Sequence, residues 1–520
     1  MSADPQDGTT LRHYPLGQRV PDSPHAVCVS LPSLADVIGY EEKDPATVQA
    51  MASGYPRFKL PAYVEQLTRH TASELGDPPR DVLLLNSDKA AAGLLDYLDE
   101  PAAKAETADA HAYVHFPAEP DAYARAFKFL QHTGCGLSSR QAEHHLLQEG
   151  LLDQPFPEAL HPGDAQATVL EQLTHIAGTP AEDILLTNSG MNAFYAAFLA
   201  TREIQRPRGR TLWIQLGWLY LDTSEILQKF LGPEERHIQH LDVFDLDGLE
   251  QLFTAHPGQV AALITEAPTN PLLQTPDLPR IHELASQHGA LLITDPTSST
   301  PANIDLLPHA DLLANSLTKY AGNQGDLLAG ALLHNPASPF YEDLKELTPL
   351  HHEPPHTRDL QRLAHEIQDY PETLDTINRN ALALAELLDA HPAVRKLHWA
   401  YSPPSKDNYQ KLAKRPDAPG GLLTIELEGA LTDFYDPIRL LKSPSFGTRH
   451  SMICPFMYLA HYDLVSTPEG RQHLAHHHID PELIRIAVGT EPTDQLLQVF
   501  KEALDNAHPP STIPTFPKSP

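Results

Sequence analysis

The chain has 520 residues, of which 37 are basic and 68 acidic, so its formal net charge is -31. This negative charge excludes nucleic acid and anionic membranes as general partners, because both would repel it. Residues 1–19 are polar and no apolar run approaches ~18 residues, so we expect neither an export signal nor a membrane span. Three widely separated cysteines suit a reducing compartment and predict a cytoplasmic protein. The histidine clusters lack a pattern of accompanying ligands, and we predict no metal site.

The length of the chain predicts several domains. Single hydrophobic cores stop growing near ~250–300 residues, so this chain should divide into two or three domains. We predict an N-terminal extension over residues 1–110, a large domain over residues 111–375, a smaller C-terminal α/β domain over residues 376–508, and a mobile, proline-rich tail over residues 509–520.

The extension contains its own predicted elements. We expect a helix over residues 62–73 and a strand followed by a helix over residues 81–98, and the Ala- and acid-rich residues 99–112 are typical of a linker. Residues 64–98 are similar in sequence to residues 170–199. Chance likeness and a decayed duplication explain this similarity about equally well.

The middle of the chain alternates apolar runs with amphipathic stretches such as residues 278–288. The runs predict strands over residues 183–187, 211–215, 260–265, 290–294 and 311–314. Nearly continuous hydrophobicity in strands that are separated by helices favours a parallel sheet covered on both faces. Ligands of such sheets gather at the carboxyl ends of the strands. Further along the chain, we expect a helix over residues 372–391 and strands over residues 421–426 and 484–488.

Two charged residues follow neighbouring predicted strands. Asp295 ends one apolar run, and Lys319 comes shortly after the next. A lysine in this place can bond to the aldehyde of pyridoxal phosphate (PLP), and a carboxylate can keep the pyridine nitrogen of the coenzyme protonated. The pair therefore predicts a PLP site.

Other residues suit the same site. Backbone amides at Gly190 and Met191, between a strand and a helix, can approach a phosphate, although a glycine there is usually only a turn. Tyr220 suits a ring stacked on the coenzyme or a place in the core, and Asn270 suits a hydrogen bond to the coenzyme or a turn. Arg485 is a charge in an apolar strand, so it needs a partner, which a substrate carboxylate would provide.

The order of these motifs resembles that of a known family. The series S-G-M, Y-x-x-T, E-x-P-x-N-P, a strand-ending aspartate, S-x-T-K and R-x-x-V-G-x-E is similar to the Cys/Met metabolism family of PLP enzymes, over residues 138–507. The resemblance implies an aspartate-aminotransferase-like α/β fold (fold type I) with a mostly parallel sheet. It also implies that Lys319 bonds to the coenzyme, that Asp295 pairs with its ring nitrogen and that Tyr220 stacks on its ring. The remaining implied roles are phosphate binding by Gly190, Met191, Ser316 and Thr318, and substrate binding by Arg485 and Ser445.

Longer strings in the N-terminal half look like those of the extended cystathionine γ-synthases best known from fungi. They include P-H-A-V-C-V-S-L-P, G-Y-P-R-F and G-L-S-S-R-Q-A-E. This resemblance implies a transferase of methionine biosynthesis that replaces the acyl group of O-acetyl- or O-succinylhomoserine by cysteine and so forms cystathionine. Cystathionine lyases, methionine γ-lyase and O-acylhomoserine sulfhydrylases have the same motifs and stay open as alternatives, as does a catalytically silent regulatory subunit.

One family feature has two candidates in this sequence. In most members, a Tyr-x-Arg from the neighbouring subunit binds the phosphate. Order along the chain favours Arg140 for this contact, whereas Tyr55 and Arg57 keep both residue types but lie far upstream. Leu221-Asp222 replace the glycines that usually follow the stacking tyrosine. The resemblance implies a homodimer or a homotetramer.

Overall fold

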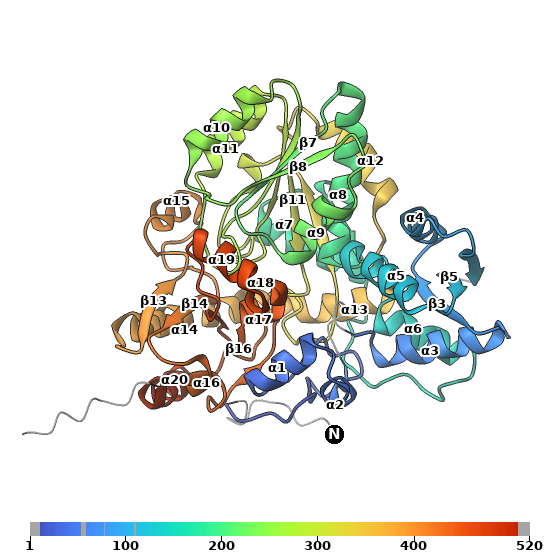
Figure 1. Cartoon of the computed structure of the whole chain (residues 1–520), viewed down its shortest axis with the longest axis horizontal. Helices are drawn as coiled ribbons and strands as arrows, with labels where there is room; N and C mark the ends of the chain where they lie inside the picture. Colours follow the sequence, from blue (N-terminus) through green and yellow to red (C-terminus); the bar gives the residue numbers. More distant parts are fainter. Residues whose placement is uncertain (1–10, 54–58, 77, 109–110, 508–520) are drawn as a thin grey trace, which may run out of the picture.

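A seven-stranded sheet with helices on both faces forms the centre of the molecule (Figure 1). The computed structural model describes residues 11–53, 59–76, 78–108 and 111–507, so the predicted tail lies outside the described residues. Both faces of the sheet are buried. Leu292 packs into the core on one face, whereas Leu291 and Ile293 pack into the core on the other, because successive side chains of a strand alternate in direction.

The strand order of this sheet is β6-β12-β11-β10-β9-β7-β8. β12 is antiparallel to both of its neighbours, and the other neighbouring pairs are parallel. The predicted α/β fold with a mostly parallel sheet is therefore confirmed. The strands are β6 (Ile184–Thr187), β7 (Leu212–Leu216), β8 (Arg236–His240), β9 (Val260–Glu266), β10 (Leu291–Asp295), β11 (Leu312–Ser316) and β12 (Gly330–His334).

Several helices of this unit begin at short polar side chains that cap them. Ser189 accepts a hydrogen bond from the backbone N–H of Asn192 at the start of α8, and Asp277 does the same for Arg280 at the start of α11. The helices are α7 (Ala165–Ala177), α8 (Gly190–Gln205), α9 (Leu221–Lys229), α10 (Leu246–Ala255), α11 (Leu278–Gln287), α12 (Tyr341–His351) and α13 (Thr357–Glu366).

The C-terminal part forms a second, five-stranded sheet in the order β13-β14-β17-β16-β15. Its strands are β13 (Val394–His398), β14 (Leu422–Leu427), β15 (Leu441–Lys442), β16 (Met452–Pro455) and β17 (Ile484–Ala487). The surrounding helices are α14 (Tyr370–Ala390), α15 (Ser405–Leu412), α16 (Leu431–Tyr435), α17 (Phe456–Ala460), α18 (Tyr462–Ser466), α19 (Pro468–His476) and α20 (Thr493–Ala507). The predicted helix and the two predicted strands of this part are confirmed.

A small α/β unit lies beside α8 and α9 (Figure 1). It consists of α3 (Ala62–Glu74), β3 (Arg80–Leu85), α4 (Asp88–Leu98), β4 (Lys104–Ala108), β5 (His111–Pro117) and α5 (Pro120–Thr133), and α6 (Ser139–Gln148) follows. The predicted helix and strand–helix pair are confirmed. The predicted linker over residues 99–112 is wrong, because β4 and β5 pair with each other there. The boundary expected at residue 110 falls between these two strands.

Residues 11–53, which we call the N-terminal segment, run under the C-terminal sheet. They form β1 (Arg19–Val20), β2 (Cys28–Val29), α1 (Leu34–Glu41) and α2 (Pro45–Ala50). The N–H of Val27 donates to the carbonyl of Gly325 at 2.9 Å, and the N–H of Leu31 donates to the carbonyl of Lys442 at 2.9 Å. The segment is thus hydrogen-bonded both to the loop that follows Lys319 and to the C-terminal sheet.

Over the described ranges, no helix combines the length and the apolarity that crossing a membrane requires. Cys28, Cys135 and Cys454 are all described and buried, and no disulfide joins them.

Candidate active site

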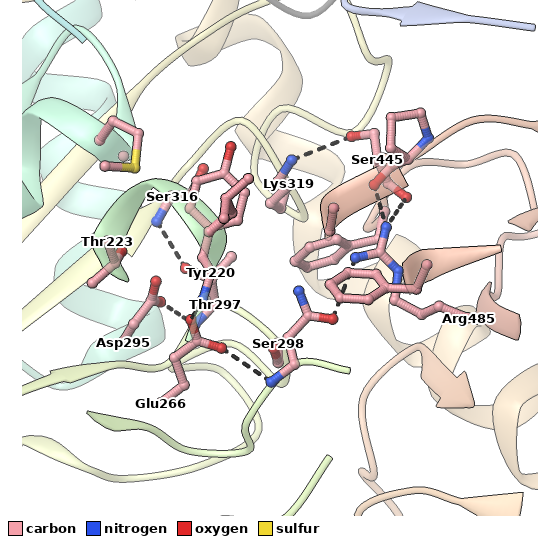
Figure 2. Close-up of a pocket in the computed structure, with 18 of the residues that line it drawn as sticks. Tyr220, Thr223, Glu266, Asp295, Thr297, Ser298, Ser316, Lys319, Ser445 and Arg485 are labelled. Carbon is pink, nitrogen blue, oxygen red and sulfur yellow. Dashed lines mark hydrogen bonds between the residues drawn. The ribbon is translucent and has the colours of Figure 1, made fainter. Parts of the chain in front are cut away.

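A pocket at the carboxyl ends of the parallel strands brings together most of the predicted site residues (Figure 2). One wall comes from the large sheet and its helices, and the other comes from β16, β17, α17 and the loop around Ser445. The predicted residues that line the pocket are Gly190, Met191, Tyr220, Asn270, Asp295, Ser316, Lys319, Ser445 and Arg485.

Lys319 is buried in this pocket, with 8% of its surface exposed. Its Nζ donates to the Oγ of Ser445 at 3.3 Å and lies 5.0 Å from the centre of the Phe446 ring (Figure 2). The loop that carries these two residues can approach so closely because the next residue is glycine. A Cβ on Gly447, which has φ +73°, would lie 2.8 Å from the backbone nitrogen of Tyr320.

Asp295 and Glu266 lie next to each other at the ends of β10 and β9, where they are register partners. Burial raises the pKa of Asp295 to about 6, although the N–H of Thr297, which donates to Asp295 Oδ1 at 2.8 Å, favours the ionised form. Burial and then the neighbouring charge of Asp295 raise the pKa of Glu266 well above its usual value. Glu266 accepts hydrogen bonds from the backbone N–H groups of Tyr220 and Asn270.

The start of α8 approaches Ser316 very closely. A Cβ on Gly190 would lie 2.7 Å from the Cβ of Ser316, so any larger residue would force the two elements apart. The free N–H groups of the first turn of α8 and the Ser316 hydroxyl therefore converge on one region of the pocket, which suits an anion. Thr318 does not line this pocket. Its hydroxyl donates to the carbonyl of Ala329 at 3.3 Å and accepts the N–H of the same residue.

Arg485 is 3% exposed and enters the pocket from β17. Its Nη1 donates to Asn270 Oδ1 at 3.3 Å, and its Nη2 donates to the carbonyls of Pro444 and Ser445. The rings of Phe446 and Phe456 lie 5.2 and 5.1 Å from its Cζ. Among the described residues, no carboxylate lies within 4.0 Å of this guanidinium. Arg485 is therefore a buried cation that is held mainly by neutral acceptors, and its charge partly offsets the raised pKa of Glu266.

Arg140 lies outside the pocket and is equally buried, with 1% of its surface exposed. Its guanidinium pairs with the carboxylates of Glu158, Asp326 and Asp359, at 2.6, 3.5 and 3.2 Å. This arrangement argues against the predicted contact to a neighbouring subunit's phosphate, because the side chain is enclosed and neutralised within its own subunit. The alternative candidates, Tyr55 and Arg57, lie outside the described residues.

Several pocket residues were not identified from the sequence. Phe446 is the middle residue of the Ser445-Phe446-Gly447 motif, in which only Ser445 was assigned a role, and Phe456 belongs to a segment without a distinctive pattern. Thr297 and Ser298 follow Asp295 in a loop. Glu266 had a usable signal, because it ends a predicted strand just as Asp295 does.

The donors of this pocket fit PLP. The first turn of α8, together with Ser316, can hold its phosphate, Asp295 can pair with its ring nitrogen, and Lys319 lies on the same pocket wall as Ser445. The tight approach of Gly190 to Ser316 is the local feature that such a phosphate site requires.

Comparisons with known proteins agree with this fit. Residues 163–505 match the family described as Cys/Met metabolism PLP-dependent enzyme. The L-2-amino-4-chloropent-4-enoate dechlorinase/desaturase of Streptantibioticus cattleyicolor is 40% identical and covers 94% of this chain and 98% of that protein. The cystathionine gamma-synthase of Neurospora crassa is 28% identical over 96% of this chain and 100% of that protein.

A solved structure shows the same fold. The cystathionine gamma synthase of Xanthomonas oryzae pv. oryzae in complex with cystathionine superposes with a TM-score of 0.56, at 23% identity, over 68% of this chain and 90% of that chain. The family match over residues 163–505 includes both sheets and the residues that line the pocket. This chain belongs to the family of Cys/Met metabolism PLP-dependent enzymes, and PLP is its cofactor.

Proposed function

We propose that this enzyme removes a leaving group from the γ carbon of an α-amino acid. The observation that carries the proposal is the buried Arg485, which faces the same pocket as Lys319. A buried arginine without a carboxylate suits the α-carboxylate of an amino acid. The choice of the γ carbon is supported by relatives whose names describe reactions there, a dechlorinase acting on a 4-chloro-2-amino acid and a cystathionine gamma-synthase.

Each pocket residue then has a task. Arg485 binds the α-carboxylate, and Ser445 positions the substrate and the Lys319 amine. Lys319 Nζ takes the proton from Cα and moves protons at Cβ. PLP supplies an electron-accepting ring when it is bound. Asp295 would keep that ring protonated, and Tyr220 would stack on it.

The remaining predicted residues hold the coenzyme in place. Gly190, Met191 and Ser316 would bind its phosphate, and Asn270, which accepts a hydrogen bond from Arg485, would donate one to a substituent of the ring. Thr318 supports this site through its bonds to Ala329.

Replacement of the leaving group by cysteine, which would make the enzyme a cystathionine γ-synthase, is the second candidate. The fungal relatives with the same N-terminal extension support it. Lyases and sulfhydrylases of this family need the same residues in the first half of the reaction. A silent regulatory subunit is disfavoured because Lys319, Asp295 and Arg485 are all retained in one pocket.

A direct assay tests the proposal. The PLP-loaded protein is incubated with O-acetylhomoserine, and separately with a γ-chlorinated amino acid, each with and without cysteine. We expect release of acetate or chloride in both cases, and mass spectrometry identifies the amino-acid product. Lys319→Ala is the matched control. If no γ-substituted amino acid releases its substituent, the proposed function is wrong.

We also propose a cytoplasmic homodimer or homotetramer whose partners are small amino acids. The three cysteines, which form no disulfide, suit a reducing compartment, and membership of the family suits a homo-oligomer. Light scattering of the purified PLP-loaded protein would distinguish the two assemblies, and a monomer would contradict both.

A further inference from the structure

The charges that line the pocket set a limit on the substrate. Among the lining residues that the structure describes, Lys319 and Arg485 are the cations, and Glu266 and Asp295 are the carboxyl groups. Each cation already has a task under the proposed function, on which this inference rests. Lys319 serves the coenzyme and the proton transfers, and Arg485 binds the α-carboxylate. A second carboxylate on the substrate would have no further cation to pair with among these lining residues.

The wall near Lys319 and Arg485 is aromatic and aliphatic. The Phe446 ring lies 5.0 Å from Lys319 Nζ and 5.2 Å from Arg485 Cζ, so it spans the distance between the two groups that would hold the reacting amino acid. Phe456 and Leu459 line the pocket from α17, and Phe194 lines it from α8. A side chain that extends along these groups loses its water.

Neutral hydroxyl groups do not change this balance. Tyr220, Thr223 and Ser298 also line the pocket and can donate hydrogen bonds. A hydroxyl does not neutralise a carboxylate, and a charge that loses its water without an opposite charge is strongly disfavoured.

We propose that the pocket selects amino acids whose γ substituent is uncharged, such as a halide or an acetyl ester. It disfavours a succinyl ester, which has a second carboxylate, and cystathionine, which has a second carboxylate and a second ammonium group. In the reaction that follows, the bond between Cγ and the substituent breaks, and the substituent departs with the bonding electrons as chloride or acetate. Lys319 takes one proton from Cα and one from Cβ, returns one of them to the carbon chain and releases the other to solvent, so the amino acid loses HX and gains a carbon–carbon double bond.

Binding of two unreactive amino acids tests this selectivity without turnover. L-Norleucine and L-2-aminoadipate have side chains of similar length, but only the second ends in a carboxylate. Titration of the PLP-loaded protein, followed by the absorbance of the bound coenzyme, should give a dissociation constant for norleucine that is smaller by about tenfold or more. Equal affinities, or tighter binding of aminoadipate, would overturn the proposal. So would failure of both to bind.

A reaction with the two esters provides the second measurement. We expect kcat/KM for O-acetylhomoserine to exceed that for O-succinylhomoserine by about tenfold or more. Norleucine binding without release from any γ-substituted amino acid would support the selectivity and contradict the proposed function, so the two failures are distinguishable.

A variant that adds a cation at the pocket should change the preference. Ala460, at the end of α17, lines the pocket and is only partly buried, so a longer side chain can be placed there. Ala460→Arg should raise the ratio of succinyl to acetyl ester turnover by about tenfold, whereas the uncharged Ala460→Gln should leave the ratio near that of the parent protein. An equal change in both variants would show that shape, and not charge, sets the preference, and would overturn the proposal.

Discussion

Asp295 and Glu266 face each other across the parallel strands β10 and β9, as register partners at the carboxyl ends of both. Two carboxyl groups therefore lie side by side in a buried place. Burial raises the pKa of both groups, and the charge of Asp295 raises that of Glu266 further. The pair is electrostatically costly in the empty protein and becomes favourable when a protonated pyridine ring lies against Asp295.

Replacing Asp295 by asparagine should stabilise the coenzyme-free protein at neutral pH. Burial raises the folded-state pKa to about 6, above the usual 3.8, so the carboxylate lowers the free energy of unfolding as the pH rises through this window. Asparagine removes this charge and can still accept the N–H of Thr297. Denaturant titrations should show a gain of about 1–3 kcal/mol at pH 7.5 and little change at pH 4.

The same variant should bind PLP far more weakly, because the ring nitrogen loses its anionic partner. Glu266→Gln is the matched control, since it neutralises the neighbouring carboxyl group while leaving Asp295 in place. We expect this control to retain coenzyme affinity within a few fold. Equal losses of affinity in both variants would show that Asp295 has no special role toward the ring.

Replacing the buried arginines Arg485 and Arg140 by glutamine should have different effects, one mainly on substrate binding and the other mainly on stability. Arg485→Gln removes the proposed partner of the substrate α-carboxylate, so the KM for O-acetylhomoserine should rise by about 10- to 100-fold. The free energy of unfolding should change less than in Arg140→Gln, because the loss of Arg485 removes hydrogen bonds to Asn270, Pro444 and Ser445 but no described ion pair. Steady-state kinetics and thermal unfolding measure the two effects.

Arg140→Gln should instead destabilise the fold by about 3–5 kcal/mol, because it leaves the buried carboxylates of Glu158, Asp326 and Asp359 without their cation. The KM of the folded fraction should stay near that of the parent protein. A large increase in KM with an intact fold would restore Arg140 as a site residue.

Lys319 should be the point of covalent attachment of PLP. Borohydride reduction of the loaded protein should add the mass of the reduced coenzyme to the peptide that contains Lys319, and the purified protein should be yellow. Lys319→Arg keeps the positive charge beside Ser445 and Phe446 but cannot form this bond, so the variant should lack both the label and the colour. Label on any other lysine would contradict the assignment.

Gly190→Ala should weaken coenzyme binding without weakening the helix. The new Cβ would lie 2.7 Å from the Cβ of Ser316, so Ser316 would have to move away from the phosphate site. We expect the dissociation constant of PLP to rise by about tenfold, which fluorescence titration can measure. Gly93→Ala is the control, because Gly93 lies in α4, outside the pocket, and its Cβ would meet only the ring of Phe129, at 3.3 Å. Similar losses in both variants would contradict this explanation.

The sequence predicted the parts of the fold where hydrophobicity is strong. The buried strands β9 and β10 are continuous apolar runs and were identified, whereas β8 was missed because Arg236–His240 is an edge strand rich in polar residues. β12 was missed because Gly330 begins it directly after a glycine-spaced loop. The hairpin of β4 and β5 was taken for a linker because β4 is mostly exposed and contains little that distinguishes it from a polar connection.

Site residues could be predicted where the sheet topology alone brings them together, and not where they depend on ion pairs between residues that are far apart in the sequence. Asp295, Ser316 and Lys319 follow strand ends, and the topology of a parallel sheet is sufficient to bring them together. The pairing of Arg140 with Glu158, Asp326 and Asp359 joins residues that are distant in sequence, so no local pattern shows that its charge is already neutralised. Glu266 was overlooked for a different reason, since its motif drew attention to Asn270.

The N-terminal segment constrains how the two sheets can move. Its hydrogen bonds from Val27 to Gly325 and from Leu31 to Lys442 join the loop that follows Lys319 to β15 of the C-terminal sheet through a strap of only a few residues. A hinge rotation that opened the cleft would have to stretch this strap or detach one of its ends. If the pocket exchanges its substrate by such a rotation, that step would require this segment, which is distant in sequence from Asp295 and Lys319, to detach at one end.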